Sequence, residues 1–484
     1  MTNNNRDFLV VVFGKIAQVI LMFATLKVST YLLPPNIMGQ VYIFTTVYTF
    51  FVFFLISPIG QYFNRYTHQW ECEGVLFSRL KLYFCYMTVV CVTAMIGAGA
   101  VHLLGGANDF TLYPFLILTG LFVLVVSANQ TVIPLLNMLN YRILFTILTF
   151  FTGFTALVFS ICFVIFVDII ATAWLMGLLL GNALILIVGV FYLRNILIVK
   201  EDVSVCLVDL TCLNKQNAYK IAKFAVPVSL ATVFMWAQNA GYRVSIERYL
   251  GLDYLGLLGV GFMVATQLSS VVESILMQYL QPNFYRRIKG ADFKERTQAV
   301  NAYLSITIPV YFSLALFLTF SIEYIFPILV SGEYKEGYLF CVFGVWIEFF
   351  RMVTNAIGTI AHSEVKMKGY MYPYIFGALT TNVLVYLAAT SSYELDLIPI
   401  ALLVGASITC LIMYINMQKI MCFSISLLTL LLSGITVVPC ILYFHFISFT
   451  PEIGLSYLAL LCLGGFIFLG SLTALFFTDR KIYG

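Results

Sequence analysis

The stretch FLVVVFGKIAQVILMFATLKVSTYLL, from Phe8 to Leu33, has only two charged side chains, Lys15 and Lys27. A helix needs about 20 mostly apolar residues to cross the roughly 30 Å hydrocarbon core of a bilayer. The stretch therefore predicts a membrane-spanning helix. It is longer than the apolar part of a signal peptide and no small-residue cleavage site closes it, so we expect an uncleaved first span.

Similar apolar runs recur along the whole chain and predict about fourteen spanning helices. They lie near residues 8–33, 41–58, 82–104, 112–133, 143–167, 169–193, 224–247, 256–280, 302–330, 337–360, 371–390, 397–418, 425–447 and 455–477. The residue-by-residue alternation of a membrane β-barrel is absent. The sequence therefore predicts an all-α integral membrane protein.

The composition excludes most soluble classes. Hydrophobic residues make up 61% of the chain and charged residues 10%, whereas soluble proteins carry about 25% charged residues. A soluble enzyme or a nucleic-acid-binding protein is thus excluded. The 11 cysteines form no CxxC pair and no cluster with histidine, so we expect neither a metal site nor a cofactor.

The distribution of Lys and Arg predicts the orientation of the spans. If the N-terminus is cytoplasmic, 20 of the 26 Lys and Arg residues fall in cytoplasmic segments and only Arg248 and Lys335 fall outside. Positive charge collects on the cytoplasmic side of spanning helices. We therefore expect a multi-pass membrane protein with both termini in the cytoplasm.

The longest polar segment divides the chain into two halves and a tail. We expect an N-terminal six-helix bundle at 1–200, a cytoplasmic linker at 201–222, a C-terminal six-helix bundle at 223–420 and two further spanning helices at 421–484. The halves show a faint repeat, in which a constant offset of 216 residues places Lys27 on Arg243. Duplicated bundles are a known plan for transporters.

Short motifs in both halves carry a resemblance to a known family. In the first half they are Leu33-Pro-Pro-Asn-Ile-Met-Gly39-Gln-Val-Tyr42 and Ser57-Pro-Ile-Gly-Gln-Tyr-Phe-Asn-Arg65. In the second half they are Phe224-Ala-Val-Pro227, Trp236-Ala-Gln-Asn239, Arg243, Leu250-Gly251, Gly256, Gln281-Pro-Asn-Phe-Tyr285 and Gly332-Glu-Tyr334. These motifs resemble bacterial O-antigen and capsule repeat-unit flippases of the multidrug/oligosaccharidyl-lipid/polysaccharide exporter (MOP) superfamily.

The resemblance implies two six-helix bundles around a central cavity that opens alternately to each side of the membrane. It also implies a substrate in which an oligosaccharide repeat unit is linked to polyprenyl pyrophosphate. The chain departs from the family at Gly241-Tyr242, where relatives often place an acid before the arginine. That departure puts an acid–arginine pair at Arg243 in doubt.

Polar side chains within the first and seventh spans are candidates for substrate binding. Charge near the bilayer centre costs about 2.5–3.5 kcal/mol on insertion scales and therefore needs a reason. Lys15 and Gln18 share one face of the first span, and Asn239 and Arg243 share a face of the seventh with Trp236. A packing role is the alternative for each, and Lys27 is expected to extend to the membrane surface.

The eighth and tenth spans hold the remaining candidates. Glu348 and Arg351 are three residues apart, so they can pair on one face of a helix, and Asn355 follows one turn later. Arg351 and Asn355 are candidates for substrate binding, whereas Glu273 and Glu348 are candidates for coupling to an ion. A buried ion pair that only fixes packing is the alternative for Glu348 and Arg351.

These features favour a flippase for lipid-linked oligosaccharide. The chain has no phosphate-binding loop for ATP, so transport would be coupled to an ion gradient or driven by the substrate's own gradient. Its partners would be the lipid-linked substrate, membrane lipids and the polymerase and chain-length machinery of lipopolysaccharide or capsule synthesis, and it would not be an enzyme. The first alternative is a multidrug or cation antiporter of the same superfamily. A membrane polysaccharide polymerase or acyltransferase is a weaker alternative because the outer loops are short and the four histidines are dispersed.

Overall fold

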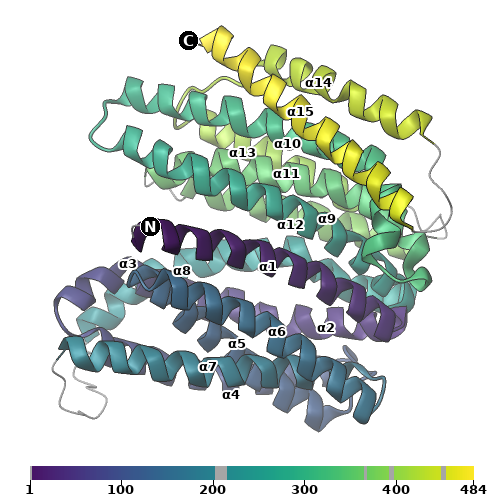
Figure 1. The fold of residues 1–484 in the computed structure, drawn as a ribbon. Helices are drawn as coiled ribbons and strands as arrows, with labels where there is room; N and C mark the ends of the chain where they lie inside the picture. Colours follow the sequence, from purple (N-terminus) through teal and green to yellow (C-terminus); the bar gives the residue numbers. More distant parts are fainter. Residues whose placement is uncertain (1–2, 202–214, 365–367, 392–396, 448–453, 484) are drawn as a thin grey trace. The chain divides into compact units, whose positions relative to one another are not determined.

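The computed structural model describes residues 3–201, 215–364, 368–391, 397–447 and 454–483. Within these ranges nearly the whole backbone is helical and no strand is present (Figure 1). Thirteen helical segments of this part are long and apolar enough to cross a membrane. The predicted class, an all-α integral membrane protein, is confirmed. Most of the predicted linker 201–222 lies outside the described residues.

The thirteen segments agree with the prediction of about fourteen spans. One of them, Tyr219–Ile288, is 70 residues long and contains the two predicted spans 224–247 and 256–280. The helix is interrupted between them at Gly251, whose φ of 84° is accessible mainly to glycine. One continuous helical segment therefore accounts for two crossings.

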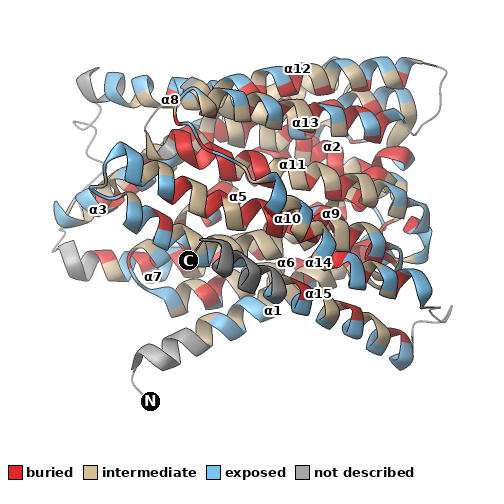
Figure 2. Ribbon diagram, turned by 90° about the horizontal axis from the view of Figure 1, so that it is seen from above, coloured by how far each residue is buried: buried red, intermediate tan, exposed pale blue. Residues whose placement is uncertain are grey.

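The first of two compact units is Met1–Gly256. It contains α1 (Asn3–Leu32), α2 (Pro35–Phe51), η1 (Val52–Ile56), α3 (Ser57–Cys72), α4 (Leu76–Leu103), α5 (Leu112–Met138), α6 (Arg142–Phe166), α7 (Ala171–Glu201), α8 (Lys215–Trp236), η3 (Ala237–Gly241) and the start of α9 (Tyr242–Ile288). Helix α5 packs against α4 and α7, and α6 packs against α7 and α1. Buried residues occur along the whole of α5, which forms the core of this unit (Figure 2).

Two short π-helical turns, η1 and η3, interrupt the α-helices of the first unit. A π-turn bonds each N–H to the carbonyl five residues back, so its backbone is wider than that of an α-helix. The hydroxyl of Thr232 on α8 donates to the carbonyl of Phe53 within η1 at 2.6 Å. The wide turn thus gains a hydrogen-bond partner from the neighbouring helix.

The second compact unit is Leu257–Gly484. It contains the rest of α9, α10 (Phe293–Leu329), η4 (Gly332–Gly337), α11 (Tyr338–Ser363), α12 (Lys368–Thr390), α13 (Leu397–Gln418), α14 (Leu427–Phe446) and α15 (Leu455–Tyr483). Asp292 begins α10 by accepting the N–H of Glu295, whose carboxylate accepts the N–H of Asp292 in return. Helix α11 packs between α10 and α13, and α12 packs against α13.

The last two helices attach to the second unit through α10. Helix α14 packs against α10, and α15 packs against both of them (Figure 1). Their outward faces carry many exposed apolar side chains, among them Leu431, Ile435 and Leu469. Such faces suit contact with lipid. The predicted division of the chain into bundles at 1–200 and 223–420 and a tail at 421–484 stays a prediction.

Candidate functional site

The charged candidates of the eighth and tenth spans meet in the second unit. The guanidinium of Arg351 on α11 contacts Glu348 of the same helix at 2.6 Å and Glu273 of α9 at 2.8 Å. The predicted pairing of Glu348 with Arg351 is confirmed. The arginine is therefore shared between two carboxylates rather than one.

Two neutral side chains complete this cluster, which we call the acidic cluster: Thr266, Glu273, Glu348, Arg351 and Asn355. The hydroxyl of Thr266 donates to Glu348 Oε1 at 2.8 Å, and the amide of Asn355 lies 3.5 Å from Glu273 Oε1. Two carboxylates and one guanidinium leave the cluster with a net charge of −1 when all three groups are ionised. Glu348 is only 7% exposed, so little solvent screens that charge.

Small residues allow α9 and α11 to approach closely enough to form the cluster. A Cβ added at Gly344 would lie 2.9 Å from the Cβ of Ala265, and one added at Gly261 would lie 2.7 Å from the carbonyl oxygen of Gly337. Gly344 lies one turn before Glu348, and Ala265 lies beside Thr266. The close contact thus brings the Thr266 hydroxyl within reach of the Glu348 carboxylate.

Arg243 of the first unit has a different environment. Its guanidinium carbon lies 5.2 Å from the centre of the Tyr42 ring, and Nη1 lies 3.5 Å from the Thr45 hydroxyl. The ring face attracts a cation. None of the ion pairs within the described ranges involves Arg243, in agreement with the missing acid at Gly241-Tyr242.

Trp236, the last residue of α8, contacts α2 as Arg243 does. Its indole N–H donates to the carbonyl of Thr46 on α2 at 3.0 Å. Thr232, Trp236 and Arg243 therefore all contact α2 or η1. Asn239 does not join them: it lies exposed within η3, where the π-turn changes the helical periodicity.

The two candidates of the first span lie on α1. Lys15 is exposed, whereas Gln18 is half-buried and its amide lies 3.4 Å from the carbonyl oxygen of Thr146 on α6. No hydrogen bond or ion pair of the described residues joins Lys15 to another candidate. Lys15 thus remains an uncompensated cation on an apolar helix, and Gln18 makes a packing contact.

The sequence did not single out three residues that contact the candidates: Tyr42, Thr45 and Thr266. Tyr42 is the last residue of the motif Leu33–Tyr42, so the sequence contained one indication that it matters. Thr266 offered none, because its role depends on how α9 packs against α11. Among the described residues, no group of three or more His, Cys, Asp or Glu side chains is arranged to hold a metal ion.

Comparisons with known proteins identify the fold. No family model matches the chain, and no curated protein sequence matches it. Solved structures do match. A lipid II flippase, MurJ, in an inward closed conformation has a TM-score of 0.64 at 14% sequence identity, over 98% of this chain and 99% of that one.

Multidrug transporters share the same fold. An inward-facing multidrug resistance MATE transporter of the MOP superfamily has a TM-score of 0.60 at 10% identity, over 85% of this chain and 97% of that one. A MATE transporter of Vibrio cholerae has a TM-score of 0.50 at 12% identity, over 84% of this chain and 98% of that one. The chain therefore has the fold of MOP-superfamily transporters. The names of these neighbours describe a flippase and transporters.

Proposed function

We propose that this protein is a flippase that moves polyprenyl-pyrophosphate-linked oligosaccharide repeat units from the cytoplasmic to the outer leaflet by alternating access. The repeat units would belong to O-antigen or capsule synthesis, and the polymerase and chain-length machinery of that synthesis would be its partners. The motifs at Pro34-Pro35 and Trp236 support this class of substrate through their resemblance to such flippases.

The observation that carries the proposal is the extent of the structural match. The lipid II flippase matches 98% of this chain, whereas the first MATE transporter matches 85%. The part of this chain that only the flippase matches is comparable in length with two spanning helices. The chain thus shares nearly all of its length with a protein named as a lipid II flippase.

The uncompensated cations suit an anionic head group. A pyrophosphate diester carries about two negative charges, and attraction to a fixed cation strengthens as the local dielectric constant falls. Lys15 is exposed, and Arg243 contacts a tyrosine ring and a threonine hydroxyl instead of a carboxylate. Both side chains are therefore free to attract phosphate. The charge of Arg351 is already compensated, so its contribution to substrate binding would come through hydrogen bonds.

The acidic cluster suits coupling to a proton or sodium gradient. With one arginine for two glutamates, it has a surplus negative charge inside a membrane-spanning unit. A bound cation would neutralise that surplus, and intramembrane carboxylates commonly mark ion pathways. Glu273 and Glu348 would thus hold the coupling ion.

Export should depend on Lys15 and Arg243. We expect Lys15→Gln and Arg243→Gln each to lower surface glycan at least about tenfold at unchanged membrane abundance. A tenfold slower transport corresponds to a rise of about 1.4 kcal/mol in the activation free energy. Lys335→Gln is the matched control, because Lys335 is an exposed cation of η4. Full export by both variants at normal abundance would refute the cationic substrate site.

A multidrug or cation antiporter is the second candidate, since MATE transporters share the fold and the acidic cluster suits a cation. The two functions differ in their readouts. Cells lacking the gene would lose surface glycan if it encodes the flippase and would become sensitive to cationic drugs if it encodes the antiporter.

Both termini should lie in the cytoplasm of a bacterial inner-membrane protein. The reason is the strong excess of Lys and Arg in segments on that side. A reporter enzyme that is active only outside the cytoplasm, fused after Gly484, should therefore be silent. The same reporter placed in the loop at Gly332–Gly337 should be active, and the reverse pattern would overturn the orientation.

A further inference from the structure

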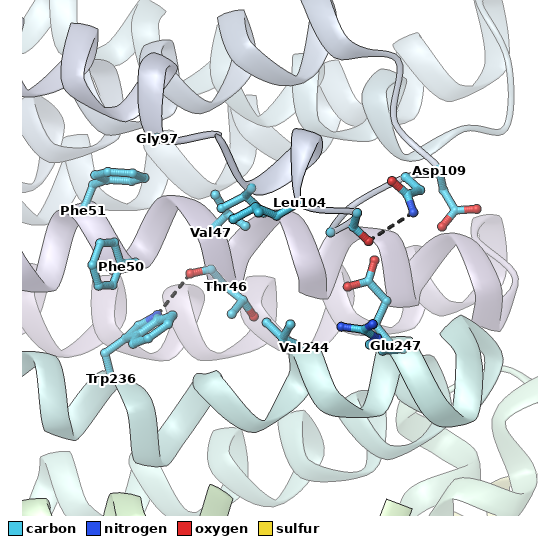
Figure 3. Close-up of a pocket in the computed structure, with 15 residues that line it drawn as sticks. Thr46, Val47, Phe50, Phe51, Gly97, Leu104, Asp109, Trp236, Val244 and Glu247 are labelled. Atoms are coloured by element: carbon cyan, nitrogen blue, oxygen red, sulfur yellow. Dashed lines mark hydrogen bonds between the residues drawn. The ribbon is translucent and has the colours of Figure 1, made fainter. Parts of the chain in front are cut away.

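The first unit contains a cavity of about 930 Å³ between α2, α4 and the chain that runs from α8 into α9 (Figure 3). Its volume falls within the range of about 300–1,000 Å³ that small-molecule sites occupy. The cavity is lined by Gly97 and Val101 of α4 and by Leu104 directly after it, so it extends for about 10 Å along the axis of that helix. None of the candidate residues discussed above lines it except Trp236.

One end of the cavity is aromatic. Phe50 and Phe51 of α2 and Trp236 line it, and the Phe50 and Trp236 rings meet edge to face with centroids 4.9 Å apart (Figure 3). The hydrogen bond from Trp236 to the Thr46 carbonyl fixes the indole ring. This end therefore offers a rigid apolar surface.

The other end is charged. Asp109 lies in the loop between α4 and α5, and Glu247 comes from α9 (Figure 3). Arg248, the next residue of α9, also lines the cavity. Glu247 Oε1 accepts the backbone N–H of Ala107 at 3.1 Å, which ties the loop to α9. In the same loop the Asn108 amide donates to the Gly105 carbonyl at 3.0 Å. The Ala107 contact thus fixes the Glu247 carboxylate, and Asp109 follows Asn108 in the same hydrogen-bonded loop.

The rim of the cavity is apolar and open. Leu104 is 85% exposed and Val244 is 45% exposed, and both line the cavity. Leu103, beside the rim, is also largely exposed. Exposed leucines at the end of a spanning helix suit contact with hydrocarbon, so this rim suits the approach of an acyl chain.

We propose that this cavity binds an aminophospholipid, with the primary ammonium of its head group between Asp109 and Glu247. The charges are complementary: the ammonium meets two carboxylates, and the phosphate diester meets the guanidinium of Arg248. An acyl chain lies along Val101, Val244 and the aromatic end. This assignment is independent of the transported substrate and holds for a flippase or an antiporter alike.

The ammonium must carry hydrogens for this fit. A primary ammonium donates three hydrogen bonds, and carboxylates only accept them. A choline head group has the same charge but no N–H, so it can donate a hydrogen bond to neither carboxylate. The cavity should therefore distinguish phosphatidylethanolamine from phosphatidylcholine with the same acyl chains.

The test uses the full-length protein in nanodiscs with equal amounts of these two lipids. Native mass spectrometry then counts the lipids that the protein retains after detergent release. We expect about a tenfold preference for phosphatidylethanolamine, the size expected for one charge-assisted hydrogen bond. The double variant Asp109→Asn, Glu247→Gln should bring the ratio close to one.

The substitutions keep the shape of the loop, because glutamine at 247 still has an oxygen to accept the Ala107 N–H. Asp109→Asn alone leaves that contact untouched and should lower the preference severalfold. Glu336→Gln, which removes an exposed acid from η4 outside the cavity, should leave the ratio unchanged.

Two results would overturn the assignment. They are equal retention of both lipids by the unmodified protein and an unchanged preference in the double variant. Each variant should unfold at the same temperature as the unmodified protein, which would show that the substitutions leave the loop and the helices intact.

Discussion

Replacing Arg351 by glutamine is expected to lower the membrane abundance and the unfolding temperature of the protein sharply. The substitution leaves Glu273 and Glu348 facing each other without their shared cation. Removing one partner of a buried ion pair typically costs about 3–5 kcal/mol, because the remaining charge is uncompensated. Quantified membrane fractions and thermal unfolding of purified protein measure the effect.

A neutral cluster separates folding from transport. The triple variant Glu273→Gln, Glu348→Gln, Arg351→Gln removes all three charges and should recover most of the lost stability. Recovered abundance without export would mean that the cluster also takes part in transport. Arg296→Gln, which breaks a pair with Glu364 near the start of α10, is the control and should cost less. Normal stability of Arg351→Gln would show that the cluster does not support the fold.

Alanine at Gly39 or at Gly256 should also destabilise the first unit strongly. A Cβ at Gly39 would collide with the backbone carbonyl of Leu252, and a Cβ at Gly256 would collide with that of Pro35. Both obstacles are backbone atoms, which cannot turn aside as a side chain does. Overpacking usually lowers the free energy of unfolding by about 1–3 kcal/mol. We expect each of these two variants to lose about 3 kcal/mol or more.

The control for these variants is Gly470→Ala on α15, where an added Cβ meets nothing within 4 Å. Alanine in a helix is about 1 kcal/mol more favourable than glycine, so this variant should be as stable as the unmodified protein or more so. Unfolding temperatures measured in one detergent compare all three variants. Similar values for Gly39→Ala and Gly470→Ala would contradict the close approach at Gly39.

Hydropathy predicted the spans because each depends on its own composition. It did not predict that the helix of the second span continues through η1 into α3, as far as Cys72. The polar residues Gln61, Asn64 and Arg65 end the apolar run but do not end the helix. Hydropathy detects where a helix suits lipid, whereas backbone hydrogen bonds decide where the helix stops.

Part of the acidic cluster was predictable and part was not. Glu348 and Arg351 are neighbours on one helix, so their spacing alone predicts the pair. Glu273 and Thr266 join them only because α9 packs against α11 at small residues such as Gly344. Helix packing depends on long-range contacts that a periodicity argument does not contain.

The π-turn at Ala237–Gly241 changes which positions of the two aligned segments are equivalent. It accommodates one residue more than an α-helical turn, so every later side chain is rotated by about 100° relative to an unbroken helix. The aligned part of α1 contains no such turn. By helical position Arg243 therefore corresponds to Leu26, which is 1% exposed, rather than to Lys27. An alignment of the segments needs a one-residue gap here, and with that gap Arg243 and Lys27 no longer stand at equivalent positions, so the predicted repeat does not extend to these two cations.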